Sequence, residues 1–480
     1  MSDKPNIVFI LCDNTGWGDF SCYGGLTPTP RIDKLAGEGV RLRNYTVEAQ
    51  CTPTRSAIMT GRQSVRSGTY KVPLPGQGKG GLAPWEYTIG NLLSDAGYAT
   101  SLWGKWHLGD DDSRLPTEQG FDEWWGYRNS ADECGWTSYA IFDALAKEHG
   151  IEPPKLWEGK KGGKQTAVRE LDLEVRPLLD ELITEKATDY IKRSAKGDKP
   201  FFTYVALSHV HPPEESHPDF HQTDPNRNLE YSDVIAEMDY RVGQILDSIE
   251  DAGIADNTVV VFSSDNAAGE IPAMLGGSNG PFRGSFFTPP SEGSMRTPAM
   301  VRWPGKVPSD VVTDEPLTAH DWYKTFAQLA GASDKVPTDR PLDGVDASEF
   351  LLGKSETSGR QSVIFFGPDG ELMSVKFKNW KMWLRYSEGV DKPIVQPQFP
   401  LIFDLGADPN ERYNIFSDRL DMGFVFGIMM KPIVEYELST VEYPNIKPGE
   451  EFDGYKGAAH VADEAKAKLA DHKYHTGRPG

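Results

Sequence analysis

Cys51 is followed by a proline two residues on and an arginine four residues on, in the run Cys51-Thr52-Pro53-Thr54-Arg55. Proline suits the first turn of a helix, so we expect a helix over residues 53–60. The free N–H groups of its first turn would favour negative charge beside the sulfur, and Arg55 would lie one turn further along. This arrangement indicates a reactive side chain next to an anion site. A buried cysteine without chemistry is the alternative that the short pattern leaves open.

Two pairs of oxygen-bearing side chains follow apolar segments that are expected to be strands. Asp13-Asn14 come directly after residues 6–12, and Asp265-Asn266 come shortly after residues 258–262. Carboxylate and amide oxygens suit a hard cation, Ca²⁺ or alternatively Mg²⁺ or Mn²⁺, and not zinc. One such pair alone is more simply a helix cap or a turn. Two pairs at equivalent strand ends favour a metal site.

Basic and titratable side chains follow two further segments of this kind. Lys105 and His107 come after residues 98–103, and His209 and His211 come after residues 201–207. A solvated lysine and structural histidines are the simpler interpretations of each residue alone. In an open α/β sheet, however, ligands collect outside the carboxyl ends of the strands. We therefore expect all four clusters to meet in space.

The elements that must position these clusters alternate between strand and helix through the first two thirds of the chain. This order predicts an α/β fold, a large mixed and mostly parallel sheet with helices on both faces. After residue 350, short apolar segments near 363–366, 372–377, 381–386 and 401–405 predict a smaller antiparallel sheet of four strands. We expect a catalytic domain over residues 1–350 and an α+β subdomain with an extended tail over residues 351–480.

Composition excludes several classes of protein. The net charge of −21 argues against nucleic acid as a partner. The four cysteines in 480 residues do not form a disulfide framework. The apolar run 6–12 is too short to cross a bilayer and lacks the features of a signal peptide. We expect no membrane segment and a cytoplasmic location by default, or a periplasmic or secreted one if a leader has been removed. The sequence does not constrain the oligomeric state.

Longer stretches carry a family resemblance. Residues 5–19 (PNIVFILCDNTGWGD), residues 97–109 (GYATSLWGKWHLG), Ser263 to Asn266 and residues 292–298 (EGSMRTP) occur in the order of the sulfatase signatures. With the cysteine motif, the chain resembles the type I, formylglycine-dependent sulfatases of the alkaline phosphatase superfamily over roughly residues 5–415. Two departures stand out. Asn14 occupies a position where the family commonly has aspartate, and a sulfate-binding lysine is missing near Arg283.

The resemblance implies a mechanism. A maturase would oxidise Cys51 to formylglycine (3-oxoalanine), and a hydroxyl of its hydrate, acidified by the cation, would attack the sulfur of a small sulfate ester. Arg55 would stabilise the ionised hydroxyl, His211 or Lys105 would protonate the leaving alcohol, and His107 would take the proton whose loss releases sulfate. The implied metal ligands are Asp13, Asn14, Cys51, Asp265 and Asn266, and the implied sulfate-binding residues are Lys105, His209, His211 and Arg283.

Other readings of the same site stay open. They are a phosphonate monoester or phosphodiester hydrolase, a catalytically silent sulfate-binding homologue and, less favoured, a papain-like cysteine hydrolase. If Arg283 replaces the missing lysine, the acidic protein should prefer compact or apolar leaving groups to polyanionic glycans. The aromatic residues Trp124, Trp125, Tyr127 and Trp136 suit either a substrate wall or core packing.

Overall fold

The computed structural model describes residues 4–74, 79–222, 230–269, 276–389, 391–418 and 420–455. Its main sheet has ten strands in the order β11-β2-β10-β9-β1-β8-β4-β5-β6-β7. The five central strands are parallel: β9 (Thr258–Ser264), β1 (Asn6–Cys12), β8 (Phe201–Ala206), β4 (Ala99–Lys105) and β5 (Glu123–Tyr127). The outer strands are β10 (Ala299–Arg302), β2 (Val40–Leu42), β11 (Val311–Thr313), β6 (Lys155–Lys160) and β7 (Thr166–Glu170). The predicted mixed, mostly parallel sheet is confirmed.

Helices cover both faces of this sheet, and the central strand shows why. Ile7, Phe9 and Leu11 of β1 face one core, whereas Val8 and Ile10 face the other. A strand buried on both sides reads as a continuous apolar run, as residues 6–12 do. The first core is closed by α2 (Cys51–Thr60), α4 (Ile89–Asp95) and α9 (Asp321–Leu329), and the second by α1 (Pro30–Gly37), α6 (Leu179–Ser194) and α7 (Glu230–Asp251).

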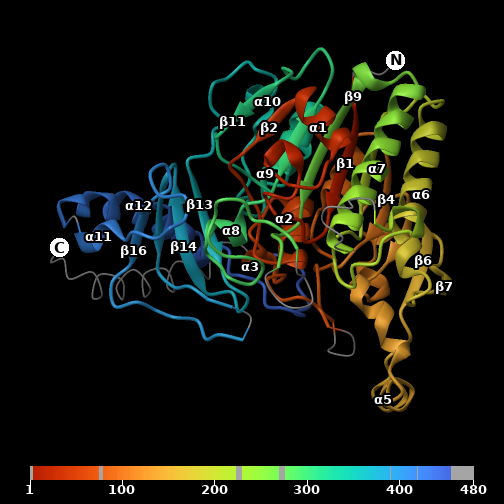
Figure 1. Ribbon diagram of the computed structural model, residues 1–480, viewed down its shortest axis with the longest axis horizontal. Coiled ribbons are helices and arrows are strands. Elements are labelled where there is room, and N and C mark those ends of the chain that lie inside the picture. Colours follow the sequence, from red (N-terminus) through yellow and green to blue (C-terminus); the bar gives the residue numbers. More distant parts are fainter. Residues whose placement is uncertain are drawn as a thin grey trace.

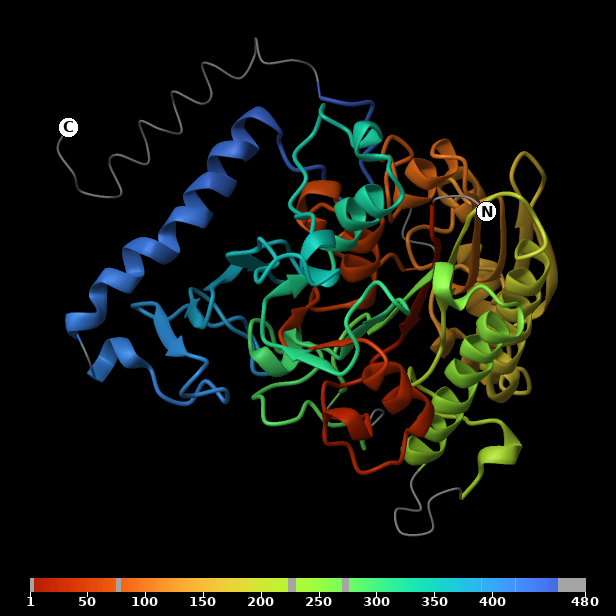
Figure 2. The ribbon, with the colours of Figure 1, turned by 90° about the horizontal axis from the view of Figure 1, so that it is seen from above.

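The C-terminal part contains the predicted antiparallel sheet of four strands. These are β13 (Ser362–Phe366), β14 (Leu372–Phe377), β15 (Trp380–Trp383) and β16 (Leu401–Asp404), and α12 (Phe424–Glu442) packs on them. Figures 1 and 2 place this sheet and α12 at the opposite end of the molecule from α6 and the β6–β7 hairpin. The boundary at residue 350 stays a prediction.

The remaining α-helices and strands are short. They are β3 (Tyr45–Thr46), β12 (Leu317–Thr318), α3 (Ser64–Ser67), α5 (Phe142–His149), α8 (Glu292–Met295), α10 (Ser348–Leu351) and α11 (Ile415–Asp418). Within the described ranges, no helix combines the length and apolar character needed to cross a membrane.

Candidate active site

Cys51 is the first residue of α2, a helix buried along its whole length. Gln50 provides no side-chain cap at this end, so the first turn can direct its N–H groups toward negative charge near the sulfur. The Cys51 Sγ lies 3.2 Å from Oδ1 of Asn266, 3.7 Å from Oδ1 of Asp13 and 3.9 Å from Oδ1 of Asn14. The helix start and the ends of β1 and β9 therefore meet at one point, as expected from the parallel strands.

Two buried cations neutralise the carboxylates at this point. Arg55 Nε and Nη2 donate to one oxygen of Asp265 at 3.0 and 2.8 Å, and Nη2 lies 3.5 Å from Asp13 Oδ2. Lys105 Nζ lies 2.7 Å from the same Asp13 oxygen. Burial raises the pKa of Asp13, but the positive charges around it, that of Lys105 first and also that of Arg55, outweigh burial and hold that pKa below its usual value. The negative charges of Asp13 and Asp265 are therefore balanced by the positive charges of Arg55 and Lys105.

His211 lies beside this cluster, and Ser130 connects it to Lys105. Ser130 Oγ is 3.0 Å from His211 Nε2 and 3.5 Å from Lys105 Nζ. His211 Nδ1 lies 2.9 Å from the carbonyl oxygen of Pro212, which can only accept a hydrogen bond. Nδ1 therefore carries the proton, and Nε2 of the neutral ring accepts from the Ser130 hydroxyl.

Ser130 did not emerge from the sequence because it belongs to no recognised motif. It lies three residues past the end of β5, a fifth parallel strand of the same sheet. The rule that selected the other clusters, polar residues beyond the carboxyl ends of strands, would have found it. Residues 123–127 contain three large aromatic residues, a composition typical of core packing that gives no sign of the polar loop that follows.

His107 is held rigidly next to the helix that carries Cys51. Its carbonyl oxygen accepts a hydrogen bond from Thr52 Oγ1 at 2.8 Å, and its backbone φ is 57°. Within the described part of the chain, the buried Nδ1 atom has no hydrogen-bond partner. Burial, followed by the charges of Lys105 and Arg55, lowers the pKa of His107 well below 6.5. The ring is therefore neutral and can accept a proton.

Two of the expected substrate-binding residues have their contacts elsewhere. The buried ring of His209 places Nε2 3.0 Å from Glu237 and 3.5 Å from Asp180. Arg283 donates to the carbonyl oxygen of Glu411 at 3.3 Å, and its guanidinium lies 5.3 Å from the centre of the Trp383 ring. The structure thus brings together all the other predicted residues but gives His209 and Arg283 different partners.

The expected aromatic wall is mostly core. Trp124, Trp125 and Tyr127 are 1–3% exposed and belong to the two cores of the main sheet. Trp136 is partly buried and lies 6.2 Å from Phe142, measured between ring centres. Core packing therefore explains the first three residues.

The donor atoms around Cys51 fit a hard divalent cation. Asp13, Asn14 and Asn266 direct oxygen atoms to one small region, and possible ligand atoms of Asp13, Cys51 and His211 lie within 4.8 Å of one another. Asp265 lies in the same cluster, where its Oδ1 accepts the N–H of Asn14 at 3.2 Å. Carboxylate and amide oxygens are the ligands that Ca²⁺ and Mg²⁺ prefer.

Comparisons with known proteins agree with this geometry. The sulfatase family model matches residues 5–332. The chain is 34% identical over 441 residues to N-acetylgalactosamine-6-sulfatase of Canis lupus familiaris, covering 85% of this chain and 81% of that protein. It is also 34% identical over 446 residues to Homo sapiens arylsulfatase G, covering 85% and 82%. The solved structure of PsFucS1 sulfatase from Pseudoalteromonas sp. has a TM-score of 0.86 at 28% identity and covers 93% of this chain and 92% of its own. This chain therefore belongs to the sulfatase family and is a sulfuric ester hydrolase.

Proposed function

We propose that this protein cleaves small sulfate monoesters with a formylglycine formed from Cys51 and one bound divalent cation, Ca²⁺ in preference to Mg²⁺ or Mn²⁺. The observation that carries the proposal is the position of the Cys51 sulfur. It lies at a helix start, 3.2–3.9 Å from three side-chain oxygens, with Arg55 and Lys105 balancing the nearby carboxylates.

Asp13, Asn14, Asp265 and Asn266 would hold the cation. When bound, it would supply positive charge beside the reacting sulfate group. Asn14 contributes no charge of its own, so this site holds two carboxylates where three would bind a cation more tightly. Calcium affinity depends on the number of ligand charges.

The remaining residues divide the charge and proton tasks. The Arg55 guanidinium, fixed by Asp265, would stabilise negative charge on the residue at position 51. Lys105 would pair with a sulfate oxygen; burial lowers its pKa, but Asp13 outweighs this and raises the pKa above its usual value, so the ammonium persists. His107, neutral in the folded protein, would accept a proton from the residue at position 51. His211 would give the leaving oxygen a proton at Nε2 after gaining one, or Lys105 would do so.

The state of the unconverted cysteine disfavours a papain-like mechanism. Burial, together with the Asp265 carboxylate, holds the pKa of the Cys51 thiol well above its usual value. A cysteine hydrolase needs a thiolate. Cys51 is also only 3% exposed, so a maturase would have to reach it before the chain has folded.

The substrate class that we propose is the sulfate ester of a phenol or of a single sugar. Two relatives are named for N-acetylgalactosamine 6-sulfate and for aryl sulfates. Turnover of an aryl sulfate, of N-acetylgalactosamine 6-sulfate and of a long sulfated glycan should be compared at equal concentrations of ester. Faster turnover of the long glycan would contradict the size preference.

The proposed function is tested by Cys51→Ala, with Cys22→Ala as the matched control. Cys22 is a free, partly buried thiol that lies outside the cluster. We expect Cys51→Ala to lose turnover of an aryl sulfate and Cys22→Ala to retain it. Peptide mass spectrometry of the wild type should find the aldehyde at position 51. Full activity in Cys51→Ala, or an active enzyme carrying only cysteine at position 51, would overturn the proposal.

A further inference from the structure

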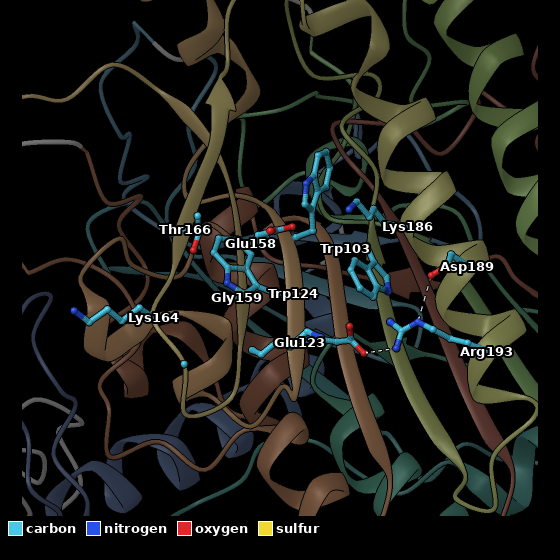
Figure 3. A pocket seen from close by; sticks show the side chains of 13 residues that line it. Trp103, Glu123, Trp124, Glu158, Gly159, Lys164, Thr166, Lys186, Asp189 and Arg193 are labelled. Carbon is cyan, nitrogen blue, oxygen red and sulfur yellow. Dashed lines mark ion pairs between the residues drawn. The ribbon is translucent and has the colours of Figure 1, made fainter.

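A hollow lies at the edge of the main sheet, away from the residues around Cys51. Strands β6 and β7 form a hairpin at the edge of the main sheet. Between this hairpin and α6 lies a cavity of about 610 Å³. Figure 3 shows Trp103 and Trp124 on the strands between α6, which carries Lys186, Asp189 and Arg193, and the hairpin, which carries Glu158 and Thr166. Small-molecule sites commonly have volumes of about 300–1,000 Å³. None of the lining residues belongs to the candidate active site.

Some of the charged side chains around this hollow form ion pairs, and others do not. Arg193 lies 2.7 Å from Glu123 and 3.3 Å from Asp189, so these three groups balance within one ion network. Lys186 and Lys160 have no carboxylate within ion-pair distance among the described residues. Lys186 Nζ lies over the Trp125 ring at 5.8 Å. Lys164 also lines the hollow and has no ion pair among the described residues. In a chain with a net charge of −21, three unpaired ammonium groups beside one cavity favour an anionic ligand.

The strand register places the second lysine on the inner side of the hollow. Lys160 stands opposite Glu123 across the β5–β6 pair, and Glu158 stands opposite Trp125. Directly paired residues of an antiparallel ladder share a face of the sheet. Glu123 faces α6, where it meets Arg193, so Lys160 and Glu158 also face α6. The side of the hollow that faces α6 therefore offers the ammonium groups of Lys160 and Lys186, the edges of indole rings and one carboxylate, Glu158, that has no ion pair among the described residues; Lys164 adds a third ammonium group at the hairpin.

We propose that this hollow binds one anionic sugar unit, bearing a sulfate or a carboxylate group, at a second site separate from the active site. Lys160 and Lys186 would contact the anionic group, and Glu158 would accept hydrogen bonds from ring hydroxyls. The narrow exposed edge of Trp125, whose ring is otherwise packed in the core, would contact the apolar edge of the sugar. A neutral sugar lacks the group that the lysines would bind. An aromatic surface beside hydrogen-bonding groups is the combination that a sugar, with apolar and polar faces, requires.

The test is calorimetric titration with galactose 6-sulfate, galacturonate and galactose, made on proteins that also carry Cys51→Ala so that the sulfate ester is not cleaved during the titration. The protein is compared with Lys160→Met/Lys186→Met and with the control Lys192→Met/Lys196→Met. The control removes the same charge from exposed positions at the end of α6, outside the hollow. Methionine keeps the apolar stem of each lysine. All three proteins share one active site, so binding there is the same in each and the difference belongs to the hollow.

We expect the hollow variant to lose at least about tenfold in affinity for an anionic sugar, equivalent to one weak charge contact from each lysine, while the control stays within about twofold. The two anionic probes distinguish a sulfate from a carboxylate as the recognised group. Aryl sulfate turnover, measured with Cys51 intact, should be the same in all three proteins. Equal affinity in the wild type and the hollow variant, or equally tight binding of galactose, would overturn the proposal. So would an equal loss in the control.

Discussion

Charged side chains buried between α8 and the C-terminal sheet offer the sharpest test of how the two parts of the molecule hold together. Glu292 of α8 lies 2.7 Å from Lys381 Nζ of β15 and 2.9 Å from Lys376 Nζ of β14. Glu411 lies 3.2 Å from Lys381. The side chains of these four residues are at most 2% exposed. Within the described ranges, Glu292 is therefore the one carboxylate that bonds both lysines across the junction.

Replacing Glu292 with glutamine should destabilise the protein strongly. Glutamine keeps the shape but leaves Lys376 and Arg296, both mostly buried, without a carboxylate partner among the described residues. Breaking a buried ion pair from one side costs about 3–5 kcal/mol, which lowers the ratio of folded to unfolded protein by roughly 100-fold or more. The control is Glu388→Gln, whose partner Arg283 lies 3.9 Å away with both side chains well exposed. It should cost less than about 1 kcal/mol.

The assay is urea unfolding, followed by circular dichroism and by tryptophan fluorescence, with the midpoint and slope compared among the variants. The double variant Glu292→Gln/Lys376→Met removes both members of a pair and should recover part of the lost stability. A Glu292→Gln protein as stable as the Glu388→Gln control would refute the reasoning. A double variant less stable than Glu292→Gln would contradict the assignment of the cost to an unpaired lysine.

Four further outcomes are expected. Asp265→Ala should lose both calcium binding, measured by calorimetry, and turnover, because it removes a predicted ligand and frees Arg55; stoichiometric zinc in the wild type would contradict the choice of cation. Arg283→Ala should change kcat/KM for an aryl sulfate by less than about threefold, since each tenfold requires 1.4 kcal/mol of lost contact and Arg283 contacts Glu411, Trp383 and the exposed Glu388; a loss of orders of magnitude would establish a direct role with substrate. His107 binds a proton less readily in the folded protein than in the unfolded chain, so the free energy of unfolding should fall as the pH drops below about 6.5. In chelator-treated protein, His107→Gln should make this pH dependence less steep. An unchanged dependence would show that another group is responsible. Release of sulfate from a long sulfated glycan should be slow, because the acidic protein repels the anionic chain. At physiological ionic strength salt screens this repulsion beyond about 8 Å, so the rate should fall further at low salt. An undiminished rate at low salt would contradict the charge argument.

The apolar and polar patterns of the sequence are sufficient to predict the main sheet and to predict that the polar clusters at its strand ends meet. Residues 7–12 are apolar at every position, which predicts burial on both faces, and parallel neighbours then bring Asp13, Asp265 and Lys105 to one edge. Strand β4 extends through Lys105, past the end expected at residue 103, because backbone pairing with β5 continues there. Local apolar patterns carry this information, since a buried strand has no other composition available to it.

Only the tertiary structure decided where individual loop side chains turn. His209 and His211 are two residues apart and equivalent in sequence, yet the first meets Glu237 and the second meets Ser130. Strand β8 ends at Ala206, so the alternation that would give both histidines one direction no longer applies. Arg283 likewise turns toward Trp383, about 100 residues away in the chain. The direction of such side chains depends on partners distant in sequence, and no local pattern contains those partners.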